Sequence, residues 1–164
     1  MKLVTKVTSM ILAVLMLTTN IFAAEEGQKL TKGINSYSYA TVADLQKVTS
    51  GTRLYGYEEK IIEMERTYQV NAFFILAVAN VETGMGCAGV GRSRNNCFGM
   101  KGGSGFQSFE NTGQSVEAFC KLIANKYFAN GRYTAYQIGQ WYCDTYWATK
   151  VTDEIDNLYY KMSK

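Results

Sequence analysis

"VNAFFILAVANVETGMG", residues 70–86, is the stretch around which the rest of this 164-residue chain can be interpreted. Apolar side chains between Phe73 and Val81 cover nearly every side of a helix, which predicts a buried helix over residues 72–82. Asn71 is a typical N-cap residue. Gly84 can end the helix in a left-handed conformation. One acid, Glu82, stands in the last turn of this apolar helix.

Apolar residues at helical spacing predict further helices on both sides of this segment. They begin near residues 55 and 115, and two more cover residues 133–142 and 151–162. Residues 84–113 are rich in glycine and indicate irregular loops with one small hairpin. We therefore expect a predominantly helical α+β domain over residues 55–164. Residues 24–54 are polar and are interpreted as a tail or linker, with a short helix near residues 42–48.

The N-terminus resembles a secretory signal peptide. Lys2 and Lys6 precede the apolar run 10–17, and the segment that follows ends in the small residues Ala23 and Ala24. The apolar run is shorter than the roughly 20 residues that span a bilayer. We expect cleavage after Ala23, secretion of the remaining chain, and no membrane span in it. An uncleaved membrane anchor is the alternative.

Charge and cysteine content narrow the class of protein. The formal charge of +3 includes the two lysines of the leader, which leaves 3 − 2 = +1 after cleavage. A dedicated nucleic-acid binder normally has a dense basic face, so no nucleic-acid partner is expected. Outside the cytosol the four cysteines can form two disulfides, for which Cys87–Cys97 and Cys120–Cys143 is one of three possible pairings. A zinc site is disfavoured because no C-x-x-C spacing occurs.

The chain contains no histidine. This argues against hydrolases that activate Ser or Cys with an imidazole, and against metallopeptidases with histidine ligands. Carboxylate chemistry remains, without metal or organic cofactor. Apolar walls and the negative end of a helix dipole both raise the pKa of a carboxyl group placed like Glu82. A carboxyl that stays protonated near neutral pH can donate a proton to a glycosidic oxygen. An ordinary surface glutamate is the alternative.

A second carboxylate is less evident. Retaining glycosidases place their two carboxyl groups about 5 Å apart and inverting ones roughly 6.5–9.5 Å apart. Glu110, in the loop-rich region, is the preferred candidate, and Glu117 and Asp144 are alternatives. A site without a second carboxylate is also possible, because the acetamido group of the substrate can attack the anomeric carbon instead.

Five blocks occur in order between residues 70 and 151: "VNAFFILAVANVETGMG", "NNCFGMK", "FQSF", "GRYTAYQIGQWYC" and "YWATKV". They resemble the bacterial glucosaminidase family of peptidoglycan hydrolases, and the resemblance runs from about residue 55 to residue 162. The resemblance implies a lysozyme-like fold, with a small loop and β lobe flanking the active-site cleft. It also implies an endo-β-N-acetylglucosaminidase that cuts peptidoglycan glycan strands, with Glu82 as the catalytic acid.

The resemblance further implies roles for residues around the cleft. The asparagine-rich turn would shape the sugar cleft and bind substrate through Asn95, Asn96, Phe98, Gly99 and Lys101; for each asparagine, holding the turn is the alternative. Tyr142 would face the cleft, where its phenol could hydrogen-bond the N-acetyl group or steady charge at the anomeric centre; a packed core tyrosine is the alternative. Trp141, Tyr146 and Trp147 offer flat faces for sugar stacking, but aromatic residues at helical spacing more often pack in the core, and core packing is the favoured interpretation. Arg92 and Arg94 either meet the carboxylates of peptidoglycan or are solvated loop charges.

Three alternative functions stay open. Muramidases and lytic transglycosylases share the fold and the acid but cut the other glycosidic bond. A non-catalytic glycan-binding module would use the same groove without releasing reducing ends. The sequence does not indicate which proteins, if any, bind this chain.

Overall fold

The central helix of the fold is α4 (Ala72–Thr83), and it forms where the apolar stretch predicts it. The computed structural model describes residues 33–164; the predicted signal peptide, 1–23, lies outside the described residues. Every residue from Ala72 to Ala79 is buried. The Asn71 side chain accepts hydrogen bonds from the backbone N–H groups of Phe73 and Phe74, at 2.9 and 3.2 Å. Gly84 ends the helix with a φ of 58°. The predicted helix and both of its caps are confirmed.

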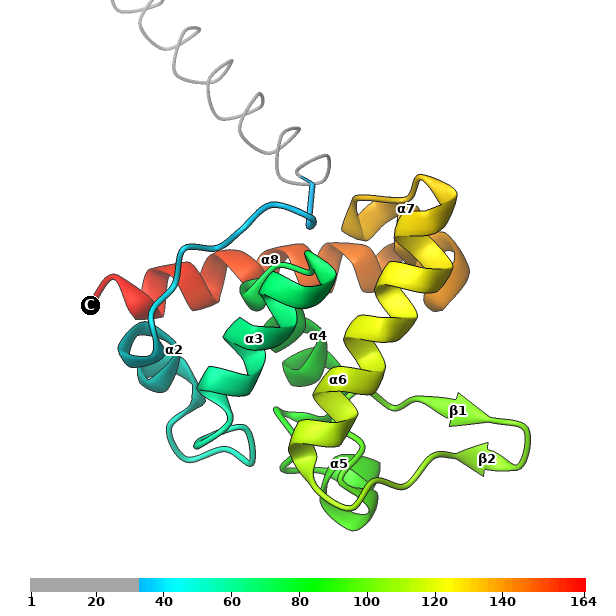
Figure 1. The fold of residues 1–164 in the computed structure, drawn as a ribbon, viewed down its shortest axis with the longest axis horizontal. Helices are drawn as coiled ribbons and strands as arrows, with labels where there is room; N and C mark the ends of the chain where they lie inside the picture. The colour runs from blue at the N-terminus through cyan, green and yellow to red at the C-terminus, as the bar shows by residue number, and fades with distance from the viewer. Residues whose placement is uncertain (1–32) are drawn as a thin grey trace, which may run out of the picture. The chain divides into compact units, whose positions relative to one another are not determined.

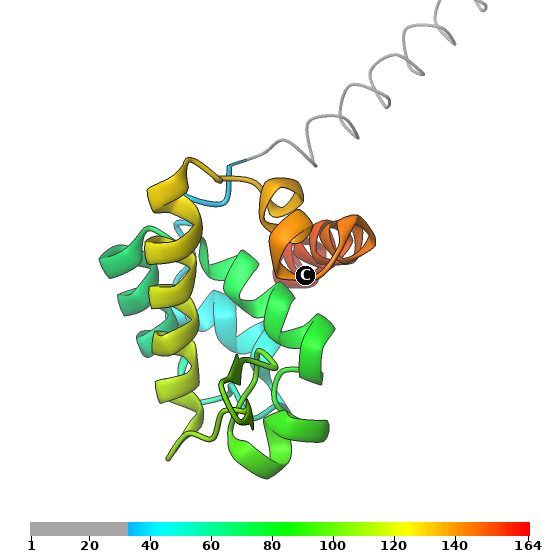
Figure 2. The ribbon, with the colours of Figure 1, turned by 90° about the vertical axis from the view of Figure 1, so that its right-hand side faces the viewer.

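Five further helices pack around α4. They are α2 (Val42–Thr49), α3 (Glu58–Tyr68), α6 (Thr112–Leu122), α7 (Ala135–Tyr142) and α8 (Thr145–Met162). The long helix α8 packs along α4, while α6 packs against α3 (Figure 1). Seen from the side, α4 lies between α6 and α8 (Figure 2). Among the described residues, no helix is both long and apolar enough to cross a membrane.

The glycine-rich region projects beyond the helical body. It contains the short helix α5 (Gly89–Arg94) and a hairpin of two-residue strands, β1 (Lys101–Gly102) and β2 (Gly105–Phe106). After α6 the chain continues as a π-helical turn, η1 (Ile123–Tyr127), and a 3-10 turn, η2 (Phe128–Asn130). The expected mostly helical architecture with one small hairpin is confirmed.

The helices differ most from the sequence prediction at the start of α8 and at α5. Helix α8 begins at Thr145, whereas the prediction began at residue 151. Asp144 explains the earlier start, because its Oδ1 accepts the N–H of Trp147 and caps the helix. Helix α5 was predicted as loop. Its glycines have poor helix propensity, and it forms where Gly91 packs tightly against Gly86 and Thr83.

Residues 33–54 are part of the folded unit, so their assignment to a tail or linker was wrong. Ile34, Leu45 and Leu54 are buried in the core. The Ile34 carbonyl accepts the N–H of Asn71, at 2.8 Å, immediately before α4 begins. The predicted short helix near residues 42–48 is confirmed as α2, which buries Leu45 and Val48. On either side of α2 the inward-facing apolar residues are widely spaced, so the segment as a whole looks polar.

All four cysteines are free in the structure. The predicted pairs Cys87–Cys97 and Cys120–Cys143 are therefore not formed. Each pair would join an exposed thiol to a buried one. Burial raises the pKa of the Cys97 and Cys120 thiols, which keeps both protonated and unreactive.

Candidate active site

Glu82 lies in a groove of about 1130 Å³ at the C-terminal end of α4. The groove is bordered by the β1–β2 hairpin, one side of α6 and the end of α7. The Glu82 side chain is half-buried. Burial raises the pKa of its carboxyl group, and this effect outweighs the Trp147 hydrogen bond and the Lys150 charge, which both act in the opposite direction. The position suits a carboxyl group that releases a proton to a bound ligand.

Trp147 holds the Glu82 carboxylate in place. Its indole Nε1–H donates to Glu82 Oε1 at 2.8 Å. The indole is only 4% exposed. It packs edge-on against Phe74, with ring centroids 6.5 Å apart, and beside Tyr142 at 4.9 Å. A side chain so enclosed cannot change rotamer freely, so Glu82 Oε2 is the oxygen left to face a ligand.

Gly99 lets the backbone pass close to that oxygen. Its φ is 60°, and a Cβ at this position would lie 3.3 Å from Glu82 Oε2. Any other residue would therefore strain the backbone and crowd the carboxylate. The neighbouring Phe98 is fully buried and stacks on Phe119, with ring centroids 4.1 Å apart. Phe98 was predicted to bind substrate; it is among the residues that line the groove, but its ring is packed in the core.

The Tyr142 phenol faces the groove wall but is already engaged. Its O–H donates to the Phe98 carbonyl at 2.8 Å. Burial, followed by the nearby Glu82 charge, raises the pKa of Tyr142 far above its ordinary value. The phenol therefore stays protonated. It joins the end of α7 to the backbone beside Gly99, on the edge of the groove.

The two asparagines hold the loop together. Asn96 is buried; its side chain donates to the carbonyls of Met100 and Gln107 and accepts the N–H of Met100. Asn95 accepts from Arg53 and donates to the carbonyls of Phe109 and Glu110. Neither asparagine is among the residues that line the groove. They shape it indirectly, by fixing the hairpin that borders it.

Of the remaining residues predicted to contact the substrate, some line the groove and others do not. Lys101 and Trp141 line the groove, and Trp141 is 65% exposed. Tyr146 does not line it; Lys150 lies 4.4 Å from the centre of its exposed ring. Arg94 donates to the Phe106 carbonyl and so braces the hairpin. Arg92 is exposed outside the groove.

Glu82 is the only acidic residue among the described residues that line the groove. Glu110 lies outside it, with Oε2 accepting a hydrogen bond from Gln114 at 2.7 Å. Glu117 forms ion pairs with Lys60 and Lys121. Asp144 caps α8. Within the described residues, no group of three or more acidic or cysteine side chains is arranged to hold a metal ion.

The contact between Trp147 and Glu82 is what sequence reasoning missed. Trp147 was one of three aromatic candidates, with Trp141 near the end of α7 and Tyr146 at the start of α8, and core packing was the favoured interpretation of all three. The structure places it in the core and on Glu82 at once. The available signal was its place in the "YWATKV" block, together with an indole N–H that needs a partner when it is buried.

Replacing Trp147 by phenylalanine should move the alkaline limb of the pH–activity profile to higher pH. The indole N–H stabilises the ionised form of Glu82, so its loss raises the pKa of the carboxyl further and keeps the acid protonated over a wider range. We also expect kcat to fall roughly tenfold as the carboxylate loses its fixed position. The measurement is kcat/KM against pH for both proteins. An alkaline limb that is unchanged or moves to lower pH would contradict the role, and Trp141→Phe is the matched control.

Comparisons with known proteins agree with this geometry. Residues 58–160 match the glucosaminidase family model, described as mannosyl-glycoprotein endo-beta-N-acetylglucosaminidase. No curated protein sequence matches the chain.

Similar solved structures come from S. aureus autolysin E. One is a catalytic mutant in complex with the disaccharide NAG-NAM, at TM-score 0.70 and 20% identity, covering 80% of this chain and 72% of that one. Another holds the muropeptide NAM-L-Ala-D-iGlu, at TM-score 0.69 and 20% identity, with the same coverage of 80% and 72%. The structural likeness shows that the two proteins share a lysozyme-like fold. Because the family model spans most of the chain, this protein belongs to the glucosaminidase family and is a glycoside hydrolase.

Proposed function

We propose that this glycoside hydrolase cuts the glycan strand of peptidoglycan as an endo-β-N-acetylglucosaminidase, with Glu82 as the general acid. The observation that carries the proposal is the half-buried Glu82 carboxyl, held by Trp147 in an open groove and with its pKa raised by burial. A groove of this size accommodates several sugar rings. The N-terminal leader predicted at residues 1–23 supports export to the cell wall as the place of action.

The chemistry follows from the single acid. Glu82 donates its proton to the glycosidic oxygen as the bond from that oxygen to the anomeric carbon breaks. No second acid lines the described groove, which favours attack on the anomeric carbon by the carbonyl oxygen of the substrate's own acetamido group. A water then opens the cyclic intermediate and returns a proton to the Glu82 carboxylate. This route predicts retention of configuration at the cleaved bond.

The charge of the groove favours an acidic glycan. Lys101, Lys121 and Lys126 line it, against the single acid Glu82. Muramic acid and its peptide stem bring carboxylates, whereas chitin-like strands are neutral. The two autolysin E complexes, with NAG-NAM and with a muropeptide, support the same substrate class.

Replacing Lys101 by alanine is expected to lower kcat/KM on peptidoglycan about three- to tenfold and to leave cleavage of neutral chitin oligosaccharides unchanged. The lysine sits on the hairpin rim, 5.3 Å from the centre of the Phe106 ring, where it can meet a substrate carboxylate. Added salt screens exposed charges. It should therefore lower the wild-type kcat/KM on peptidoglycan relative to that on chitin oligosaccharides, as the substitution does. Lys161→Ala, on the far part of α8, is the control. An equal loss on both substrates would argue against a charge role.

Mass spectrometry of the fragments released from purified peptidoglycan tests the proposed function directly. Reducing N-acetylglucosamine ends are the expected product. Reducing or anhydro muramic acid ends would assign the cut to the other glycosidic bond, as in a muramidase or a lytic transglycosylase. Binding without released fragments would indicate a glycan-binding module.

A further inference from the structure

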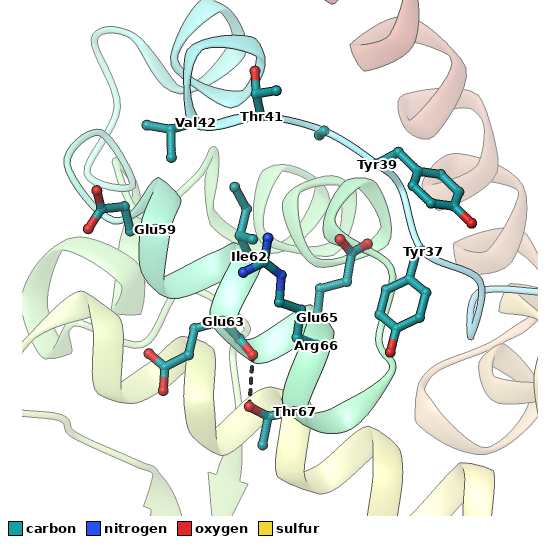
Figure 3. Close-up of a pocket in the computed structure, with 11 residues that line it drawn as sticks. Tyr37, Tyr39, Thr41, Val42, Glu59, Ile62, Glu63, Glu65, Arg66 and Thr67 are labelled. Carbon is teal, nitrogen blue, oxygen red and sulfur yellow. Dashed lines mark hydrogen bonds between the residues drawn. The ribbon is translucent and has the colours of Figure 1, made fainter.

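A second groove, of about 860 Å³, lies between the segment 37–42 and one face of α3 (Figure 3). It shares no lining residue with the Glu82 groove. One wall carries the rings of Tyr37 and Tyr39, and the other carries side chains of α3, with the Arg66 guanidinium reaching across toward the segment. Nothing in the catalytic chemistry described above uses this groove.

The tyrosine wall is fixed in place. Ser38, between the two tyrosines, donates its backbone N–H and its hydroxyl to the buried Glu65 carboxylate, at 2.8 and 2.9 Å. Two residues after Tyr39, Thr41 caps α2 in a reciprocal arrangement with Asp44. The segment is therefore anchored on both sides of Tyr39, and the rings keep a defined position relative to α3.

The tyrosine rings are presented to solvent. Tyr39 is 88% exposed and Tyr37 is 45% exposed, with ring centroids 6.4 Å apart and ring planes tilted by 58°. Tyr39 adopts a φ of 58°, a conformation that side chains with a Cβ disfavour. The fold thus holds a tyrosine in an unfavourable backbone conformation while gaining almost no burial from its ring. Such strain is characteristic of positions selected for binding.

The α3 wall complements the rings with polar groups. Glu59, Ile62 and Arg66 are spaced i, i+3 and i+7, which puts them on one face of the helix. Among the described residues, neither Glu59 nor Arg66 has a side-chain ion pair or hydrogen bond. The lining also holds the carboxylates of Glu63 and Glu65, but Glu63 pairs with Lys60 and Glu65 accepts hydrogen bonds from Ser38. The groove therefore offers a ligand the Glu59 carboxylate, the Arg66 guanidinium and the aliphatic surface of Ile62 between them. Its three acids against one arginine do not favour a phosphate backbone.

We infer that this groove binds a saccharide segment of the glycan strand, away from the bond that is cut. Sugar rings have an apolar C–H face that can lie on a tyrosine ring, and hydroxyls that pair with a carboxylate and a guanidinium. The inference rests on the proposed function for the identity of the polymer. A second contact with the same strand raises retention on an insoluble substrate without any change at Glu82.

The test measures retention of the Glu82→Gln protein on glycan strands from which the peptide stems have been removed. Adding Tyr39→Ala or Arg66→Ala should weaken retention about tenfold, whereas Tyr39→Phe, which keeps the ring, should preserve it. With Glu82 intact, these substitutions should leave kcat/KM on a short soluble oligosaccharide unchanged, because neither residue lines the catalytic groove. Both side chains are exposed, so the fold should survive, and thermal unfolding checks this.

The control is Tyr160→Ala, an exposed tyrosine on α8 outside both grooves. Retention that is unchanged by Tyr39→Ala and Arg66→Ala, or reduced equally by Tyr160→Ala, overturns the inference. Retention that requires the peptide stems overturns it as well, because the ligand would then be a peptide. The proposed function fails on a different result: the wild-type protein would then cleave neither the short oligosaccharide nor the polymer.

Discussion

Replacing Glu82 by glutamine is expected to lower the rate of glycan cleavage by about 10²–10⁴-fold, the usual contribution of a general acid. Glutamine has nearly the same shape and can still accept the Trp147 N–H through its side-chain oxygen, so the groove should keep its form. It cannot release a proton to the glycosidic oxygen. The measurement is the initial rate of reducing-end release from purified peptidoglycan.

The pH dependence provides a second test of the same residue. A general acid works in its protonated form, so activity should be present below the pKa of Glu82 and lost as the pH rises through it. Burial raises this pKa, which extends activity toward higher pH than an ordinary glutamate allows. Glu110→Gln is the matched control, because Glu110 is an exposed glutamate outside the groove. If Glu82→Gln and Glu110→Gln lower the rate of cleavage to a similar extent, the assignment of Glu82 as the acid is wrong.

Replacing Phe98 by alanine is expected to lower the free energy of unfolding by about 3–5 kcal/mol. The ring is fully buried and lies almost parallel to Phe119, at an angle of 4°. Its removal leaves a cavity beneath the loop that borders Glu82. The Phe98 carbonyl, which accepts the Tyr142 hydroxyl, would then lose its fixed position. Chemical denaturation followed by circular dichroism measures the loss.

Trp141→Ala is the comparison for Phe98→Ala. Trp141 is exposed on the groove, so its loss should change the free energy of unfolding by no more than about 0.5 kcal/mol. It should instead raise KM about two- to tenfold, if the indole stacks on a sugar ring. A Phe98→Ala protein with unchanged stability and a raised KM would contradict the assignment of Phe98 to the core and would indicate that its ring contacts the sugar.

The α4 segment shows how far sequence reasoning reaches in this protein. Its apolar pattern, the Asn71 cap and the Gly84 terminus are local signals, and each was confirmed within one or two residues. The same pattern placed Glu82 in the last turn of a buried helix. The order of the five sequence blocks then predicted the family, which the family comparison confirmed.

Prediction was less accurate where one motif combined two tasks. The block from Asn95 to Lys101 was read as a set of sugar contacts, but within it Asn96 and Phe98 stabilise the loop and the core. Phe98, Gly99 and Lys101, from the same block, line the groove, but the Phe98 ring is fully buried behind its surface. A short motif gives residue types in order but does not say which side chains point inward, since in an irregular loop no fixed period relates sequence position to direction.

The sequence by itself determined the helical architecture, the buried helix that ends in Glu82, and the exclusion of histidine-based chemistry. Only the tertiary structure decided that Trp147, 65 residues away, is the partner of Glu82, that Glu110 lies outside the groove, and that Tyr37 and Tyr39 form the wall of a second one. The physical reason is range. Caps and hydrophobic periods act within a few residues, whereas these contacts exist only once α8 has packed on α4 and the segment 37–42 on α3.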